Sequence, residues 1–192
     1  MAISVIIPIA NGDKAWREML PDLEALGSKD EIIFVATDRL LTSVKKERSL
    51  ERLHCSYSFH LTEVGRAKQL NFGAKKAKNE FLWFLHCDSR FSKTAFDALG
   101  KSILIDPAAL HFFDLKFSKD GPVLMRLNEL GVWIRSRMLR LPFGDQALAM
   151  SRTVFRDLGG FRENVPCGED HLLVWRAHQL GVGLRCVGAP HG

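Results

Sequence analysis

In residues 1–90, runs of consecutive apolar residues alternate with segments in which apolar residues recur at helical spacing. Short apolar runs bounded by turn residues are typical of strands buried on both faces, and spacings of three and four are typical of helices packed on one side. The predicted strands cover residues 3–7, 31–36, 56–61 and 80–85, and the predicted helices cover 15–26, 41–53 and 65–78. This alternation predicts an α/β fold, with a mostly parallel central sheet and helices on both faces.

The second half of the sequence is less regular. Strands are predicted at 110–117, 147–150 and 182–187, and helices at 91–104, 123–140, 151–158 and 169–180. With 192 residues, of which 46% are hydrophobic and 26% charged, the chain has a globular composition and the size of one domain. No repeat or linker divides it, so we predict a single domain over 1–192, with a first half at 1–90 and a second half at 91–192.

The charge balance narrows the possible partners only a little. The chain has 27 Lys and Arg residues against 22 Asp and Glu residues, a net charge of +5. Such an excess fits an anionic ligand, a nucleic acid or an acidic membrane surface. Because the basic residues are scattered and no recognition motif accompanies them, we expect no nucleic-acid partner.

The cysteines and the N-terminus indicate the compartment. The chain has 4 cysteines, no two of them spaced as CxxC, which argues against a disulfide scaffold or a structural zinc site. We interpret them as reduced thiols. Residues 1–8 lack the basic start and cleavage site of a signal peptide and have the pattern of a first strand. These features predict a cytoplasmic protein.

Polar residues follow three of the predicted strands, where open parallel sheets bind ligands. Asn11 follows the first strand, Asp38 the second, and His86 and Asp88 the fourth. A carboxylate and an imidazole at that last position could hold a divalent cation on a diphosphate. Alternatively, Asp88 caps the next helix and His86 is a core histidine.

Charged residues also stand at two predicted helix starts. Arg66 lies in a first turn, where a cation opposes the helix dipole, so a bound phosphate or an acidic loop is expected beside it. Glu169 and Asp170 open another helix, where they either complement its dipole or supply a general base. Asp145 and Gln146 form a polar pair before a short strand, and their role is ambiguous from the residues alone.

Several motifs occur in a meaningful order. They are ISVIIP at 3–8, GRAKQLNFGA at 65–74, FLHCDSR at 84–90, FGDQ at 143–146, FRDLGGF at 155–161 and ED at 169–170. Together they resemble the family 2 glycosyltransferases of GT-A fold, over nearly the whole chain. The segment at 65–74 is similar to that family's GR-x-x-Q-x-N-x-G-A helix. The segment at 84–90 resembles the subgroup with an LHAD-[ST]-R metal motif in place of DxD.

The resemblance implies an inverting transfer of sugar from a UDP- or GDP-linked donor to an acceptor hydroxyl. Asp88 would hold Mg²⁺ or Mn²⁺ on the diphosphate, and Asp170 would be the general base. Arg66 would meet the nucleotide or its phosphates, and Asp38 the base or ribose. The nucleotide-sugar side would also include Pro8, Asn11, Asn71 and His86, and the acceptor side Asp145, Gln146 and Glu169.

Two departures from the family pattern affect this interpretation. The family usually has an acidic residue directly after the Asn of the first loop, but here it is Gly12, with Asp13 one position later. The family also commonly continues past the last predicted strand, so a C-terminal piece is either missing or never existed. The alternative function is therefore a catalytically inactive sugar-nucleotide-binding or scaffold protein of the same fold.

The predicted helix at 123–140 combines many apolar residues with four arginines. Such a helix suits the inner face of a membrane or a lipid-linked acceptor. Core packing or a homodimer interface would use the same residues.

Overall fold

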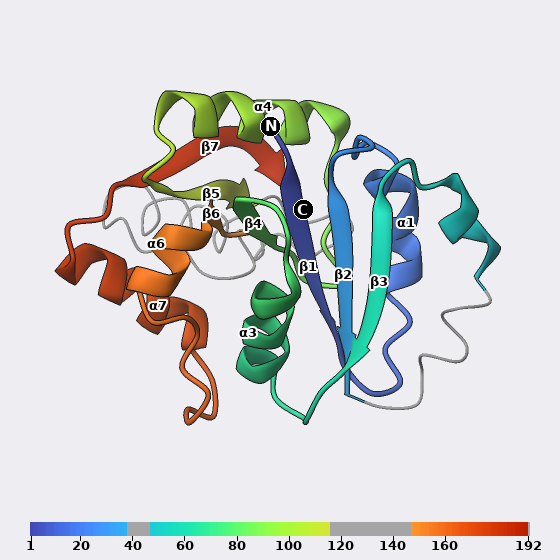
Figure 1. Ribbon diagram of the computed structural model, residues 1–192, viewed down its shortest axis with the longest axis horizontal. Helices are drawn as coiled ribbons and strands as arrows, with labels where there is room; N and C mark the ends of the chain where they lie inside the picture. The colour runs from blue at the N-terminus through green and yellow to red at the C-terminus, as the bar shows by residue number, and fades with distance from the viewer. Residues whose placement is uncertain (38–46, 116–146, 192) are drawn as a thin grey trace, which may run out of the picture.

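The computed structural model describes residues 1–37, 47–115 and 147–191. Within these ranges the centre of the molecule is a seven-stranded sheet in the order β3-β2-β1-β4-β6-β5-β7 (Figure 1). The sheet is mostly parallel, because β6 is the one described strand that runs against its neighbours. The predicted α/β fold class is confirmed.

The first four strands are β1 (Ile3–Ile9), β2 (Glu31–Ala36), β3 (Ser56–Leu61) and β4 (Phe81–Phe84), and they pair in parallel with β1 in the middle. Every residue of β1 and β2 is buried, as the continuous apolar runs predicted. Consequently the carboxyl ends of β1, β2 and β4 meet at one edge of the sheet.

The other three strands extend the sheet beyond β4. They are β6 (Ala149–Ser151), antiparallel to β4 and β5, then β5 (Leu110–Leu115), and then β7 (Leu184–His191), which runs parallel to β5. β6 thus lies between β4 and β5 in the sheet and runs antiparallel to both.

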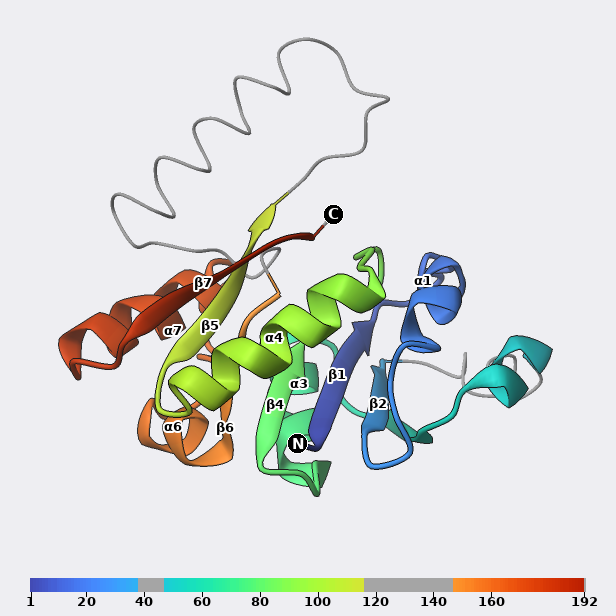
Figure 2. The ribbon, with the colours of Figure 1, turned by 90° about the horizontal axis from the view of Figure 1, so that it is seen from above.

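Helices cover both faces of the sheet (Figures 1 and 2). One face carries α1 (Trp16–Leu23) and α4 (Lys93–Ile105), and the other carries α3 (Arg66–Lys76), α6 (Arg152–Asp157) and α7 (Glu169–Gln179). Side chains alternate between the faces along a strand. In β1, Val5 and Ile7 accordingly pack in the first core and Ile6 in the second.

Several predicted elements differ from the structure in their bounds, among them β1, α1 and β6, and two further differences have a clear physical reason. In the described part of the predicted helix at 41–53, only a 3₁₀ helix, η1 (Arg48–Arg52), is present, because Glu47 has an extended backbone that an α-helix cannot continue through (φ −75°, ψ 111°). The last strand begins at Leu184 instead of 182, because the N–H of Val182 bonds to the carbonyl of Ala177 at the end of α7.

Part of the prediction lies outside the described residues. This applies to the helix at 123–140 and to Asp38, Asp145 and Gln146. Among the helices that are described, none has the length and apolar character that crossing a membrane requires.

Candidate functional site

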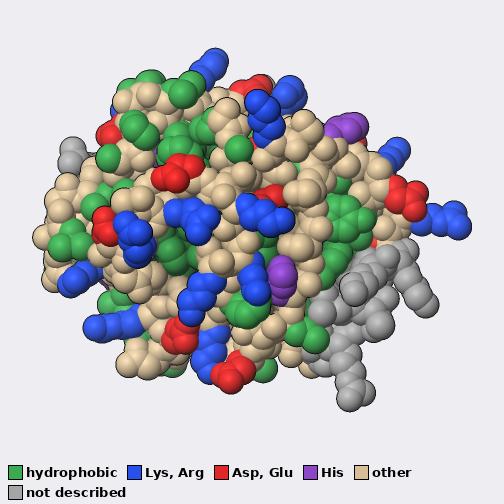
Figure 3. All heavy atoms as spheres, in the orientation of Figure 1, with side chains coloured by type: hydrophobic (Ala, Val, Ile, Leu, Met, Phe, Trp, Pro, Cys, Tyr) green, Lys and Arg blue, Asp and Glu red, His purple; other side chains and the backbone are tan. Residues whose placement is uncertain are grey.

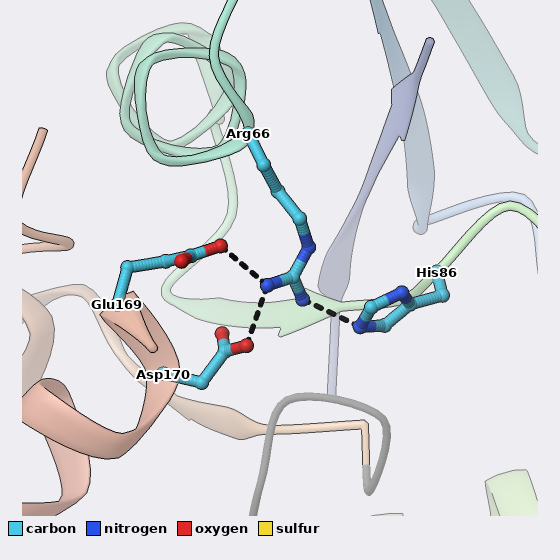
Figure 4. A network of polar contacts seen from close by, with 4 residues as sticks. All are labelled: Arg66, His86, Glu169 and Asp170. Carbon is cyan, nitrogen blue, oxygen red and sulfur yellow. Dashed lines mark hydrogen bonds and ion pairs between the residues drawn. The ribbon is translucent and has the colours of Figure 1, made fainter. Parts of the chain in front are cut away.

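Four polar side chains from three separate elements meet beyond the carboxyl end of β4 (Figure 4). Arg66, at the start of α3, directs Nη1 toward Oε1 of Glu169 at 2.6 Å and Oδ2 of Asp170 at 2.5 Å. Its Nη2 lies 2.5 Å from Nε2 of His86, which follows β4. The structure therefore brings together four residues with three expected roles: Arg66 and His86 on the nucleotide-sugar side, Glu169 on the acceptor side, and Asp170 as the general base.

His86 is a neutral hydrogen-bond acceptor in this cluster. A guanidinium can only donate, so Nε2 of His86 must accept and its ring proton must be on Nδ1. Burial, and then the positive charge of Arg66, lower the pKa of His86 to about 4, although the nearby carboxylate of Asp88 acts in the opposite direction. The imidazole thus contributes no positive charge near neutral pH.

Arg66 is the one cation among these four side chains. Burial works against its charge, but the carboxylates of Asp170 and Glu169 outweigh that effect and raise the pKa of Arg66. Glu169 and Asp170 are only 7% and 8% exposed, so they are more than dipole-complementing surface acids. The sequence analysis expected a bound phosphate or an acidic loop beside Arg66, and the structure places two acids there, Glu169 and Asp170.

One hydrogen-bond donor of Arg66 has no partner among the described residues. This donor is Nε, which is buried. Buried polar groups are nearly always paired, so an orphaned donor beside a polar cluster is a place where a ligand oxygen can bind.

Asp88 is the residue that could hold a metal. It is exposed and follows β4 two residues after His86. No group of three or more His, Cys, Asp or Glu side chains suited to a metal ion is found in the ranges 1–37, 47–115 and 147–191. This donor set still fits Mg²⁺ or Mn²⁺ on a diphosphate, because Mg²⁺ usually takes one or two carboxylates and completes its shell with phosphate oxygens and water.

Two residues of the 65–74 motif position α3 on the sheet. The side-chain amide of Gln69 is buried and donates to the carbonyls of Ile9 (3.0 Å) and Val35 (2.7 Å), at the ends of β1 and β2. Gly73 lies so close to β1 that a Cβ would be 2.5 Å from Cγ2 of Ile6. These contacts hold α3 tightly against the sheet, with Arg66 above the carboxyl edge.

Asn71 of the same motif binds the chain after α6 instead of facing the cluster. Its Nδ2 donates to the carbonyl of Phe161 and to Oε1 of Glu163, both at 2.8 Å, and its Oδ1 accepts from the N–H of Phe161 at 2.9 Å. The approach needs Gly160, which has φ +72° and whose Cβ would lie 2.9 Å from Oδ1 of Asn71. The structure thus gives Asn71 a clear structural partner and does not bring it into the cluster around Arg66.

The first loop contributes a contact that the sequence analysis missed. Pro8 is buried inside β1 and Asn11 is exposed beyond its end, and neither is among the described side chains that bond to Arg66. Asp13 accepts hydrogen bonds from the N–H of Ala15 and from Sγ of Cys87, both at 2.8 Å. Burial, together with this bond, raises the pKa of Cys87 to about 12. The displaced acid at position 13 was the available signal, and in the structure it ties the first loop to the segment after β4.

Comparison with known families identifies the class of protein. The sequence matches Glycosyl transferase family 2 over residues 4–158, a range that includes Arg66, His86 and Asp88 and ends before Glu169 and Asp170. The chain therefore belongs to glycosyl transferase family 2. A search of curated proteins found no match.

Solved structures share the fold at low sequence identity. The crystal structure of TarS from S. aureus has a TM-score of 0.72 and 20% identity over 98% of this chain and 35% of that chain. TarS 1-349 in complex with UDP-GlcNAc has a TM-score of 0.67 and 22% identity, over 92% and 53% of the two chains. The mannosyltransferase PcManGT from Pyrobaculum calidifontis, in complex with GDP-Man and Mn²⁺, has a TM-score of 0.70 and 21% identity, over 98% and 56%. The chain thus spans between 35% and 56% of these proteins.

Proposed function

We propose that this chain transfers a sugar from a nucleotide-diphosphate sugar to an acceptor hydroxyl, with inversion at the anomeric carbon and with the help of Mg²⁺ or Mn²⁺. The observation that carries the proposal is the convergence of Arg66, His86, Glu169 and Asp170 beside Asp88 at the carboxyl edge of the sheet. Ligands of open α/β sheets bind at this edge. The donors bound by TarS 1-349 and PcManGT suggest UDP- and GDP-linked sugars as the first to test.

The charge of the site supports a metal requirement. Two carboxylates face one guanidinium and a neutral imidazole, and Asp88 adds a further negative charge. A diphosphate would be repelled by this surplus unless a divalent cation accompanied it. Asp88 would hold that cation, which would stabilise the leaving diphosphate. His86 could join only by giving up its hydrogen bond to Arg66.

The residues of the chain then have defined tasks. The spare Nε–H of Arg66 would donate to an oxygen of the donor. Asp170 would take the proton from the acceptor hydroxyl as its oxygen attacks the anomeric carbon, and the bond from that carbon to the diphosphate would break with its electron pair. Glu169 would keep Arg66 in place while Asp170 acts. Asp38, Asp145 and Gln146 keep the nucleotide and acceptor roles that the family resemblance implies.

A catalytically inactive sugar-nucleotide-binding protein is the second candidate. The observation that favours it is the hydrogen bond between Asp170 and Arg66, which occupies an oxygen of the proposed base. Such a protein would bind the donor without breaking it.

Turnover of a panel of UDP- and GDP-linked sugars with Mn²⁺ separates these two functions. We expect release of nucleotide from at least one donor, and a loss of about 10²–10⁴ in rate in Asp170→Asn, the usual contribution of a general base. Asp97→Asn, an exposed acid on α4, is the matched control and should keep the wild-type rate. Donor binding without any turnover supports the inactive protein, and no binding of any donor contradicts both.

The acceptor and location remain part of the same proposal. The composition of residues 123–140 favours either a lipid-linked acceptor at the inner membrane face or, alternatively, a homodimer, and the reduced cysteines favour a cytoplasmic location. Flotation with neutral and anionic vesicles at low and high salt tests the membrane contact, and light scattering tests the dimer.

A further inference from the structure

A concave site lies away from the cluster around Arg66. It is a cavity of about 860 Å³ lined by residues of α3, β4, α6 and the loop that follows α6. Its apolar lining includes Leu82, Phe155 and Phe161, which are all buried. None of Arg66, His86, Asp88, Glu169 and Asp170 lines it. A ligand bound there would not occupy the proposed donor site.

The polar lining of this cavity is mainly basic. Lys75, Arg152, Arg156 and Arg162 line it, against the acids Glu80 and Glu163. Figure 3 shows Lys and Arg side chains gathered over α3 and α6 on this face. Arg156 pairs with Asp157 at 3.5 Å, and Glu163 accepts from Asn71.

The remaining cations are available to a ligand. Lys75, Arg152 and Arg162 form no ion pair with any other side chain in the described ranges. Arg152 donates one Nη1–H to the carbonyl of Ala77 at 2.8 Å. This bond anchors the guanidinium, and its other N–H donors remain available to a ligand.

The wall of the cavity is held in place before any ligand binds. The two-point pairing of Asn71 with the backbone of Phe161 fixes the loop after α6 to α3. Phe161 in turn packs edge-on against Phe84 of β4, with ring centroids 4.9 Å apart. A preformed wall of this kind reduces the ordering cost of binding.

We propose that this cavity binds a phosphate group carried on an apolar body. Guanidinium groups match phosphate oxygens with paired hydrogen bonds, and the apolar side chains that line the cavity offer contact to the remainder of the ligand. The volume is in the range of small-molecule sites. The ligand could be a free phosphomonoester or the head of an anionic lipid, which share this chemistry.

Hexyl phosphate is the probe for the free ligand. We expect it to bind with the amide NMR signals of Gly159 and Gly160 shifting, and to bind at least about tenfold more tightly than inorganic phosphate or hexanol, a difference of about 1.4 kcal/mol. Vesicles containing phosphatidic acid test the lipid source. Whichever source applies, its binding should be lost in Lys75→Gln/Arg162→Gln and retained in Lys29→Gln/Lys101→Gln, which removes two exposed cations elsewhere.

A second variant tests the cavity without removing any cation. Thr153 lines it in the first turn of α6, where an acidic residue is compatible with the helix. Thr153→Glu should abolish the binding of both probes while UDP and GDP binding stays unchanged. The proposal is overturned if neither probe binds, or if binding survives both Thr153→Glu and Lys75→Gln/Arg162→Gln. It is equally overturned if UDP with Mn²⁺ displaces hexyl phosphate, since the probe would then occupy the donor site.

Discussion

Arg66 and Asp170 are 104 positions apart in the sequence, yet Nη1 of the arginine lies 2.5 Å from Oδ2 of the aspartate. This pair, with Glu169 at 2.6 Å, joins the start of α3 to the start of α7 across the carboxyl edge of the sheet. The same contact therefore stabilises the fold and sets the charge of the candidate site.

Removing the guanidinium should leave two buried carboxylates without their cation. We expect Arg66→Gln to lower the free energy of unfolding by about 3 kcal/mol, the lower end for a broken buried pair, because the arginine side chain is 30% exposed. Urea denaturation measures this. Adding Glu169→Gln and Asp170→Asn to Arg66→Gln should restore part of the loss. Arg17→Gln, which breaks a more exposed pair with Glu47, should cost less than about 1 kcal/mol. A similar loss in both single variants contradicts the account.

Asn71 should matter for stability because it pairs with both backbone groups of Phe161. Asn71→Ala leaves that N–H and carbonyl without their partner, and we expect a loss of about 1–3 kcal/mol. Asn11→Ala is the matched control, because Asn11 is exposed at the end of β1. Equal midpoints of urea unfolding for the two variants would show that the pairing contributes nothing.

Alanine substitutions at Gly159 and Gly160, the two neighbouring glycines after α6, distinguish the cost of backbone strain from the cost of a steric clash. Both have positive φ, +83° for Gly159 and +72° for Gly160, so alanine at either position is strained by about 1–2 kcal/mol. Only at Gly160 would the new Cβ meet Asn71, at 2.9 Å, while nothing lies within 4 Å at Gly159. Gly160→Ala should therefore lower the melting temperature clearly more than Gly159→Ala. The reverse order would contradict the close approach.

His111 should make the protein less stable in acid. It is fully buried between the hydroxyl of Ser102 and the carbonyl of Asp106, and burial lowers its pKa from 6.5 to about 4. As the pH falls from 6.5 to 4, the unfolded chain takes up a proton at this position before the folded chain does. The free energy of unfolding should fall over that interval by about 3 kcal/mol from this residue.

Denaturation at several pH values tests that titration. His86 adds a loss of the same sign, because its folded pKa is also about 4. His111→Gln should nevertheless flatten the dependence between pH 6.5 and 4, whereas His54→Gln, at an exposed position, should leave it unchanged. An unaltered slope in His111→Gln contradicts the assignment.

The fold and the site were predictable from the sequence to different degrees. The strand at 31–36 was predicted with its observed bounds, because its continuous apolar run reflects burial on both faces. The strand at 56–61 was also predicted with its observed bounds, although its residues are exposed or half-buried in the structure. The roles within the 65–74 motif were not, because Gln69 and Asn71 bind backbone groups 60 and 90 positions away. The acidic partners of Arg66 come from the start of α7. They could not be predicted, because a local sequence pattern carries no information on where α7 lies relative to α3.

The most direct test of the proposed function is calorimetric titration of the protein with UDP and with GDP, each with Mn²⁺ and with a chelator. The site has a negative surplus, so Mn²⁺ should strengthen binding of one nucleotide by at least about tenfold, or about 1.4 kcal/mol. Asp88→Ala should remove that gain, and Asp97→Ala should keep it. Equal affinity for both nucleotides in wild type and Asp88→Ala, with and without Mn²⁺, would contradict a metal-assisted donor site at the carboxyl end of β4.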